Sequence, residues 1–280
     1  MTSRERLNNA QRMNNSLLCV GLDSDPAKMP EGFSGSPKSI LDFNKRIIDA
    51  TKDIVCGYKL NFAFYEQHGP KGFDILEKTF AYIPYNLFTI ADAKRGDIGN
   101  TSKAYARSVF EHFRADSITV APYMGRDSIE PFLEYTDKIT FLLALTSNKG
   151  SSDFQRINIK KKPLYRYVFE ETVKWKYDNL GYVVGATHPK EINELRKFGE
   201  DKIFLIPGIG AQGGDLKAII KANLGLPAII NVSRSVIHAS NGTDFQEKAR
   251  DAAIFYRDAI NDESVMFIRE HKHKRENDQL

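Results

Sequence analysis

Short apolar runs alternate with longer amphipathic segments along most of the chain. Residues 17–23 form a short apolar run that ends in a carboxylate, which is typical of a strand buried in a parallel sheet. Between residues 38 and 52, apolar side chains recur with helical spacing, which predicts an amphipathic helix. The same pattern predicts further strands at residues 54–61, 87–94, 117–123, 139–147, 180–187, 203–207 and 228–232, and further helices at about 64–82, 100–113, 128–135, 164–176, 190–198, 215–224 and 244–260.

Eight strand-helix units predict an α/β chain folded as a single (β/α)8 TIM barrel over residues 1–280. A doubly wound open sheet shows the same alternation, but it seldom needs eight similar units, and no Gly-x-Gly-x-x-Gly follows the first strand. Residues 150–162 form the longest connection without clear periodicity, on the side of such barrels where lids occur. The charged tail from about residue 268 is expected to be a frayed, solvated end.

Composition and charge exclude some classes of protein. The chain has 280 residues, 41% of them hydrophobic, and its 40 basic and 36 acidic residues give a formal charge of +4. No basic face with interleaved aromatic residues appears, so we expect no nucleic-acid binding.

No run approaches membrane-spanning length and no apolar signal region begins the chain, so we expect a soluble cytoplasmic protein without a membrane partner. Cys19 and Cys56 lie in apolar runs and are expected to be reduced, buried thiols, and the 6 histidines form no ligand cluster that predicts a metal site.

Charged residues gather at the ends of the predicted strands. Asp92 and Lys94 end the third strand on one face, and Asp97 begins the turn that follows. Lys59 ends the second strand and Asp23 ends the first. This end of a barrel is where barrel enzymes carry their chemistry, so we expect Lys59, Asp92 and Lys94 to form one network of alternating charges. An ion-pair ring that merely closes the barrel mouth is the structural alternative.

The last two strands end in residues suited to phosphate. Residues 207–214 are a glycine-rich loop that opens onto a helix, so backbone N–H groups can approach an anion there. Arg234 follows the eighth strand and carries a guanidinium suited to bidentate phosphate contact. Each feature is common by itself, but their combination after the last two strands matches the usual phosphate site of a barrel.

The sequence Asp-x-Lys-x-x-Asp-Ile-x-x-Thr, formed by Asp92, Lys94, Asp97, Ile98 and Thr101, resembles the active-site motif of the orotidine 5′-phosphate decarboxylase family. The resemblance covers nearly the whole chain. It implies decarboxylation of orotidine 5′-monophosphate to uridine 5′-monophosphate, the last step of de novo pyrimidine nucleotide synthesis, without metal or organic cofactor. It also implies that Lys94 is the proton donor, within a catalytic network whose members are Lys59, Asp92, Lys94 and Asp97.

The resemblance further implies contacts with a nucleotide substrate. In the family, the loop after the seventh strand and the arginine after the eighth strand bind the phosphate, and a serine after the fifth strand reads the base. The substrate-binding residues carried over in this way are Asp23, Thr101, Ser147, Gly210, Gln212 and Arg234. The family's Gly-Arg-Ser is Ser-Arg-Ser at residues 233–235 here, a departure that concerns the backbone path and leaves the guanidinium in place.

The resemblance also implies a homodimer in which Asp97 and Thr101 reach into the partner's site. Because the family domain occurs fused to orotate phosphoribosyltransferase, a separate transferase is a candidate partner. Two alternatives stay open. A related barrel family uses a similar Asp-x-Lys-x-x-Asp motif with magnesium to decarboxylate keto-sugar phosphates or to form hexulose phosphates, and Lys59, Ser147 and Gln212 argue against it. A catalytically inactive nucleotide-binding barrel is the other, and the intact charge set argues against that.

Overall fold

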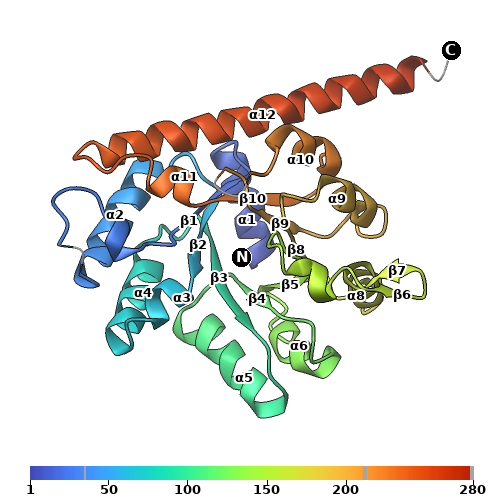
Figure 1. Cartoon of the computed structure of the whole chain (residues 1–280), viewed down its shortest axis with the longest axis horizontal. Coiled ribbons are helices and arrows are strands. Elements are labelled where there is room, and N and C mark those ends of the chain that lie inside the picture. The colour runs from blue at the N-terminus through green and yellow to red at the C-terminus, as the bar shows by residue number, and fades with distance from the viewer. Residues whose placement is uncertain (35, 211–212, 278–280) are drawn as a thin grey trace.

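Eight parallel strands close into one barrel, with the neighbour order β1-β10-β9-β8-β5-β4-β3-β2 (Figure 1). The structure is a computed structural model that describes residues 1–34, 36–210 and 213–277, with side chains as far as Phe267. The barrel strands are β1 (Leu18–Gly21), β2 (Gly57–Asn61), β3 (Phe88–Arg95), β4 (Ser117–Val120), β5 (Ile139–Leu145), β8 (Leu180–Val184), β9 (Phe204–Pro207) and β10 (Ala228–Val232). The predicted single (β/α)8 TIM barrel is confirmed.

Helices follow the strands and cover the outside of the barrel (Figure 1). The longer ones are α2 (Lys38–Thr51), α4 (Pro70–Tyr82), α5 (Gly99–Arg107), α6 (Arg126–Leu133), α8 (Leu164–Val173), α9 (Pro189–Arg196), α10 (Leu216–Asn223) and α12 (Phe245–Asn277). Shorter helical segments are η1 (Pro26–Lys28), α3 (Ala63–Glu66), the π-helical turn η2 (Ser108–His112), α7 (Ser151–Phe154) and α11 (Arg234–Ile237). Because helices cover the outer face and side chains fill the inner one, all five residues of β8 are buried.

The N-terminal helix α1 (Ser3–Met13) contacts the residues that lead into several strands. A capping box of Thr2 and Glu5 begins the helix. Gln11 Nε2 donates to the carbonyl oxygen of Ala228 at the start of β10, over 2.8 Å. Arg6 Nη1 donates over 2.7 Å to Asp116 Oδ1, just before β4. The helix therefore covers the N-terminal end of the barrel, and the opposite end is left for a site.

Two segments differ from what the pattern predicts. Residues 150–162, expected as a connection without regular structure, contain α7 and a small hairpin of β6 (Asn158–Ile159) and β7 (Lys162–Pro163). Strands of two residues are too short to leave a periodic signal. The closing helix, expected to end near residue 260, continues to Asn277 and extends past the barrel (Figure 1).

The expected frayed end is therefore wrong for the backbone as far as Asn277. No glycine or proline interrupts residues 245–277, so nothing in that segment ends the helix. Among the described residues, no helix combines the length and apolar character that crossing a membrane requires.

Candidate active site

A cavity of about 380 Å³ opens at the C-terminal end of the barrel strands. The charged part of its lining comes from β2, β3 and the segments just after β1 and β10, whereas Leu143, Val183 and Leu205 contribute an apolar part from β5, β8 and β9. The size and the mixed lining suit a small polar ligand that carries a ring. The position agrees with the end of a barrel at which enzymes of this fold act.

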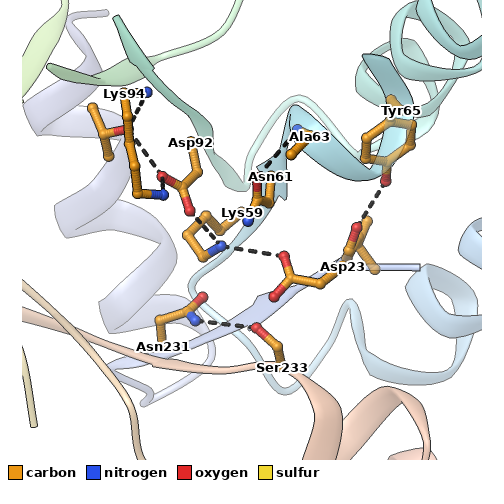
Figure 2. A network of polar contacts seen from close by, with 11 residues as sticks. Asp23, Lys59, Asn61, Ala63, Tyr65, Asp92, Lys94, Asn231 and Ser233 are labelled. Atoms are coloured by element: carbon orange, nitrogen blue, oxygen red, sulfur yellow. Dashed lines mark hydrogen bonds and ion pairs between the residues drawn. The ribbon is translucent and has the colours of Figure 1, made fainter. Parts of the chain in front are cut away.

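Four charged side chains meet in this cavity (Figure 2). Lys59 Nζ donates to Asp92 Oδ2 over 2.9 Å and to Asp23 Oδ1 over 3.3 Å. Lys94 Nζ donates to the other oxygen of Asp92, Oδ1, over 2.6 Å. The structure thus brings together the network expected from the strand ends, and Asp23 extends it by one carboxylate.

Burial and charge act against each other in this network. Burial raises the pKa of Asp92, but the neighbouring ammonium groups of Lys59 and Lys94 outweigh it and hold that pKa well below its usual range. Burial also lowers the pKa of Lys59, and the carboxylates of Asp23 and Asp92 reverse this, so the pKa of Lys59 lies above its usual range. Both groups are therefore ionised at neutral pH.

Lys94 differs from Lys59 in its surroundings. The Lys59 side chain is 5% exposed, whereas that of Lys94 is 48% exposed and faces the cavity. The backbone of Lys94 is in the left-handed region, with a φ of 48°, where the register between β3 and β4 shifts. A non-glycine residue in this conformation is strained, and such strain tends to occur at functional sites.

The base and phosphate candidates lie on other strands of the same cavity. Ser147, in the segment after β5, and Arg234, at the start of α11, both line it. Gly210 follows the lining residues of the loop after β9 and has a φ of 77°. A Cβ added there would lie 2.4 Å from Ser235 Oγ, so only glycine fits at that position. Gln212 lies outside the described residues.

Among the described candidates, Asp97 and Thr101 are absent from the cavity lining of this chain, as is Gly210, which directly follows the lining residue Ile209. Asp97 Oδ1 accepts a hydrogen bond from the Ile98 backbone N–H over 2.8 Å, next to the start of α5. Thr101 lies on the exposed side of α5. The network in one chain therefore consists of Asp23, Lys59, Asp92 and Lys94, without Asp97.

Several lining residues were missed by the sequence reasoning. Thr119 donates a hydrogen bond to Asp92 Oδ1 over 2.9 Å, and Asn61 and Asn231 line the cavity from β2 and β10. All three are polar residues within or at the end of a predicted strand, and this was the available signal. No metal-ligand cluster of three or more histidine, cysteine or acidic residues occurs among the residues that the structure describes.

Comparison with known proteins agrees with the motif. Residues 16–249 match the orotidine 5′-phosphate decarboxylase / HUMPS family. A relative from Dehalococcoides mccartyi named orotidine 5′-phosphate decarboxylase is 52% identical over 265 residues, which cover 92% of this chain and 96% of the relative.

Two solved structures share the fold. The OMP decarboxylase of Leishmania donovani superposes with a TM-score of 0.84 at 37% identity and covers 95% of this chain and 100% of its own. The UMP synthase of the same organism superposes with a TM-score of 0.82 at 38% identity, over 93% of this chain and 56% of its own longer one. Together with the charged cavity, these matches place the chain in the orotidine 5′-phosphate decarboxylase / HUMPS family, among relatives that are named orotidine 5′-phosphate decarboxylases.

Proposed function

We propose that this chain decarboxylates orotidine 5′-monophosphate to uridine 5′-monophosphate and carbon dioxide, with Lys94 as the proton donor. The observation that carries the proposal is the Lys59–Asp92–Lys94 network, which lies in the cavity of a chain 52% identical to a named decarboxylase. The magnesium-dependent alternative is not favoured, because the relative from Dehalococcoides mccartyi and the solved OMP decarboxylase of Leishmania donovani carry the decarboxylase name.

The chemistry requires a cation at the carbon that loses the carboxylate. When the bond to the carboxyl group breaks, its electron pair stays on the ring carbon and carbon dioxide leaves. The ammonium of Lys94 stabilises this developing negative charge, and one of its protons then moves to the carbon. Asp92, 2.6 Å from Lys94 Nζ, holds the ammonium in place. The neutral amine left on Lys94 regains a proton from water, and no cofactor is needed to balance the step.

The rest of the cavity binds the parts of the substrate that do not react. Arg234 and the loop that contains Gly210 and Gln212 are assigned to the phosphate, and Ser147 to the pyrimidine edge. Asp23 and Lys59 are assigned to the ribose, next to the reacting ring. Binding energy from these remote groups holds the reacting carbon against Lys94.

A direct assay tests the activity. Purified protein is mixed with orotidine 5′-monophosphate, and the loss of its absorbance is followed with and without a chelator. We expect equal rates in both conditions. Activity that disappears with the chelator would support the magnesium-dependent alternative, and no turnover in either condition would indicate an inactive nucleotide-binding barrel.

We also propose a homodimer in which Asp97 and Thr101 complete the partner's site. The support is their position outside the cavity of their own chain, next to exposed apolar side chains on neighbouring loops. Ile98 is 54% exposed and Tyr123 is 95% exposed, and apolar side chains of this size are commonly buried in interfaces.

Mixing two inactive variants tests this arrangement. Lys94→Ala and Asp97→Ala homodimers are each expected to be nearly inactive. In a heterodimer, one site carries both changes and the other carries neither. Dissociation and random re-association of equal amounts should therefore restore about a quarter of the wild-type activity, given a two-fold interface. Complete exchange, confirmed with a tag on one chain, without recovered activity would place Asp97 in the site of its own chain.

Two further proposals concern the surroundings of the enzyme. Both cysteines are free and buried, which supports a reducing, cytoplasmic compartment. Cell fractionation tests this location.

A separate orotate phosphoribosyltransferase is proposed as a partner. The support is the match to a UMP synthase in which the corresponding segment is 56% of a longer chain. Co-purification of the two proteins from the native cells tests the association.

A further inference from the structure

Thr119 occupies the middle of β4 and is buried where it lines the cavity. Its hydroxyl takes part in two hydrogen bonds at once. It donates to Asp92 Oδ1 over 2.9 Å and accepts from the backbone N–H of Lys94 over 3.0 Å. One side chain from a neighbouring strand therefore contacts both the carboxylate of the network and the backbone of the proposed proton donor.

An irregularity in β3 creates the need for this hydroxyl. Ala91 pairs with Ile118 and Arg95 pairs with Val120, so β3 advances four residues while β4 advances two. The extra residues form a bulge that contains Asp92 and Lys94. The bulge takes the Lys94 N–H out of the regular ladder, and the Thr119 hydroxyl accepts its hydrogen bond instead. It thereby supports the left-handed backbone of Lys94.

The same hydroxyl limits how the Asp92 carboxylate can turn. Oδ2 accepts from Lys59, whereas Oδ1 accepts from both Lys94 and Thr119. A lysine side chain is long and adjustable, so two ammonium groups alone allow the carboxylate to rotate with them. Thr119 is short, β-branched and fixed to the barrel wall, and its hydroxyl sets the plane of the carboxylate.

We propose that Thr119 is a positioning residue that holds Asp92 and Lys94 in their reactive arrangement. This inference rests on the proposed function. The effect is transmitted through the hydroxyl and concerns the reacting end of the substrate. The residues proposed to contact the base and the phosphate lie in segments after β5, β9 and β10, so their positions do not depend on the Thr119 hydroxyl. Removing the Thr119 hydroxyl should therefore lower kcat and change KM little.

Three variants test the role of the hydroxyl. Thr119→Val has nearly the same shape and lacks both hydrogen bonds, so kcat should fall about 10- to 100-fold while KM changes less than about threefold. Thr119→Ser keeps the hydroxyl and should restore kcat to within about threefold of wild type. Thr140→Val is the matched control, because Thr140 is a buried threonine on the adjacent β5 whose hydroxyl has no hydrogen-bond partner among the described residues. It should leave kcat unchanged.

Each outcome decides the question. Thr119→Val with wild-type kcat overturns the proposal, and so does an equal loss in Thr119→Ser or in Thr140→Val, because either would show that packing is responsible. If Thr119→Val does not fold, Thr119→Cys, whose thiol is a weak donor, takes its place with the same expectations. Wild-type protein is measured in the same assay. An inactive wild type contradicts the proposed function, whereas an active wild type beside an unaffected Thr119→Val contradicts only the role of Thr119.

Discussion

Both ends of the barrel hold charged side chains, but these side chains differ in their exposure and in their hydrogen-bond partners. At the N-terminal end, Asp116 is buried, and its carboxylate accepts hydrogen bonds from Ser3, Arg6 and Thr89. At the C-terminal end, Lys94 is half exposed to the cavity, and Asp92 is its carboxylate partner among the described residues. Ion pairs therefore stabilise the fold where protein donors saturate the carboxylate, as at Asp116, and they serve reactivity where the cation is exposed to a ligand, as at Lys94.

Arg196 extends the comparison at the N-terminal end. Its guanidinium is fully buried and lies 3.5 Å above the Phe204 ring. It donates to Asn223 Oδ1 and to the carbonyl oxygens of Lys202 and Pro227, which lead into β9 and β10. Burial lowers its pKa, and these neutral acceptors replace the water that it has lost. The Arg196 guanidinium is thus saturated and has no donor left for chemistry.

The largest expected effect is a loss of kcat when the Lys94 cation is removed from the C-terminal end of the barrel. Lys94→Ala should lower kcat about 10⁴-fold or more, because the transition state loses both its proton donor and its stabilising charge. The melting temperature should change little, since the side chain is half exposed and Asp92 keeps Lys59. Lys78→Ala, which removes an exposed lysine paired with Asp74, is the control and should leave both quantities unchanged. A kcat near that of wild type would remove Lys94 from the mechanism.

The next effect should appear in stability and not in activity. Asp116→Ala leaves Arg6 without its partner at the buried end, and the free energy of unfolding should fall by about 3–5 kcal/mol. The kcat of the folded fraction should stay at the wild-type value. Asp74→Ala breaks an exposed pair and should cost less than about 1 kcal/mol in urea unfolding. If both variants lose the same stability, the two classes of ion pair do not differ.

A smaller effect, on KM, is expected for Arg234, the residue proposed to bind the phosphate at the C-terminal end of the barrel. Arg234→Ala should raise KM for orotidine 5′-monophosphate about 10- to 100-fold, the loss of one charge-assisted contact of about 1.5–3 kcal/mol. Turnover of orotidine, which lacks the phosphate, should not change. Equal losses for the two substrates would place Arg234 away from the phosphate.

The smallest effect concerns the pH dependence of stability. Because the pKa of Asp92 is lowered on folding, its contribution is present above its unfolded pKa of about 3.9 and is lost as the pH falls further. Because the pKa of Lys59 is raised, its contribution is present below about 10.4 and is lost as the pH rises through its folded pKa. The stability difference between wild type and Asp92→Asn should therefore stay constant from about pH 5 to 9 and shrink in acid. A difference that varies near neutrality would contradict the shifted pKa values.

The local pattern of apolar and polar residues was sufficient to predict the barrel and much of the site. Strand alternation and position at a strand end are properties of neighbouring residues, so the meeting of Lys59, Asp92 and Lys94 could be expected from the sequence. The short β6–β7 hairpin could not, because two-residue strands carry no periodicity. The full length of α12 was also missed, although the absence of glycine and proline after residue 244 was a signal for it.

By itself, the sequence determined the order of the barrel strands and of the helices between them, the end of the barrel that carries the charged site, and the resemblance to a family. Only the tertiary structure decided that Thr119 joins Asp92 and that a bulge in β3 turns Lys94. The physical reason is that hydrogen bonds between strands depend on register. Register is set when the whole barrel closes, because each strand must fit two neighbours at once.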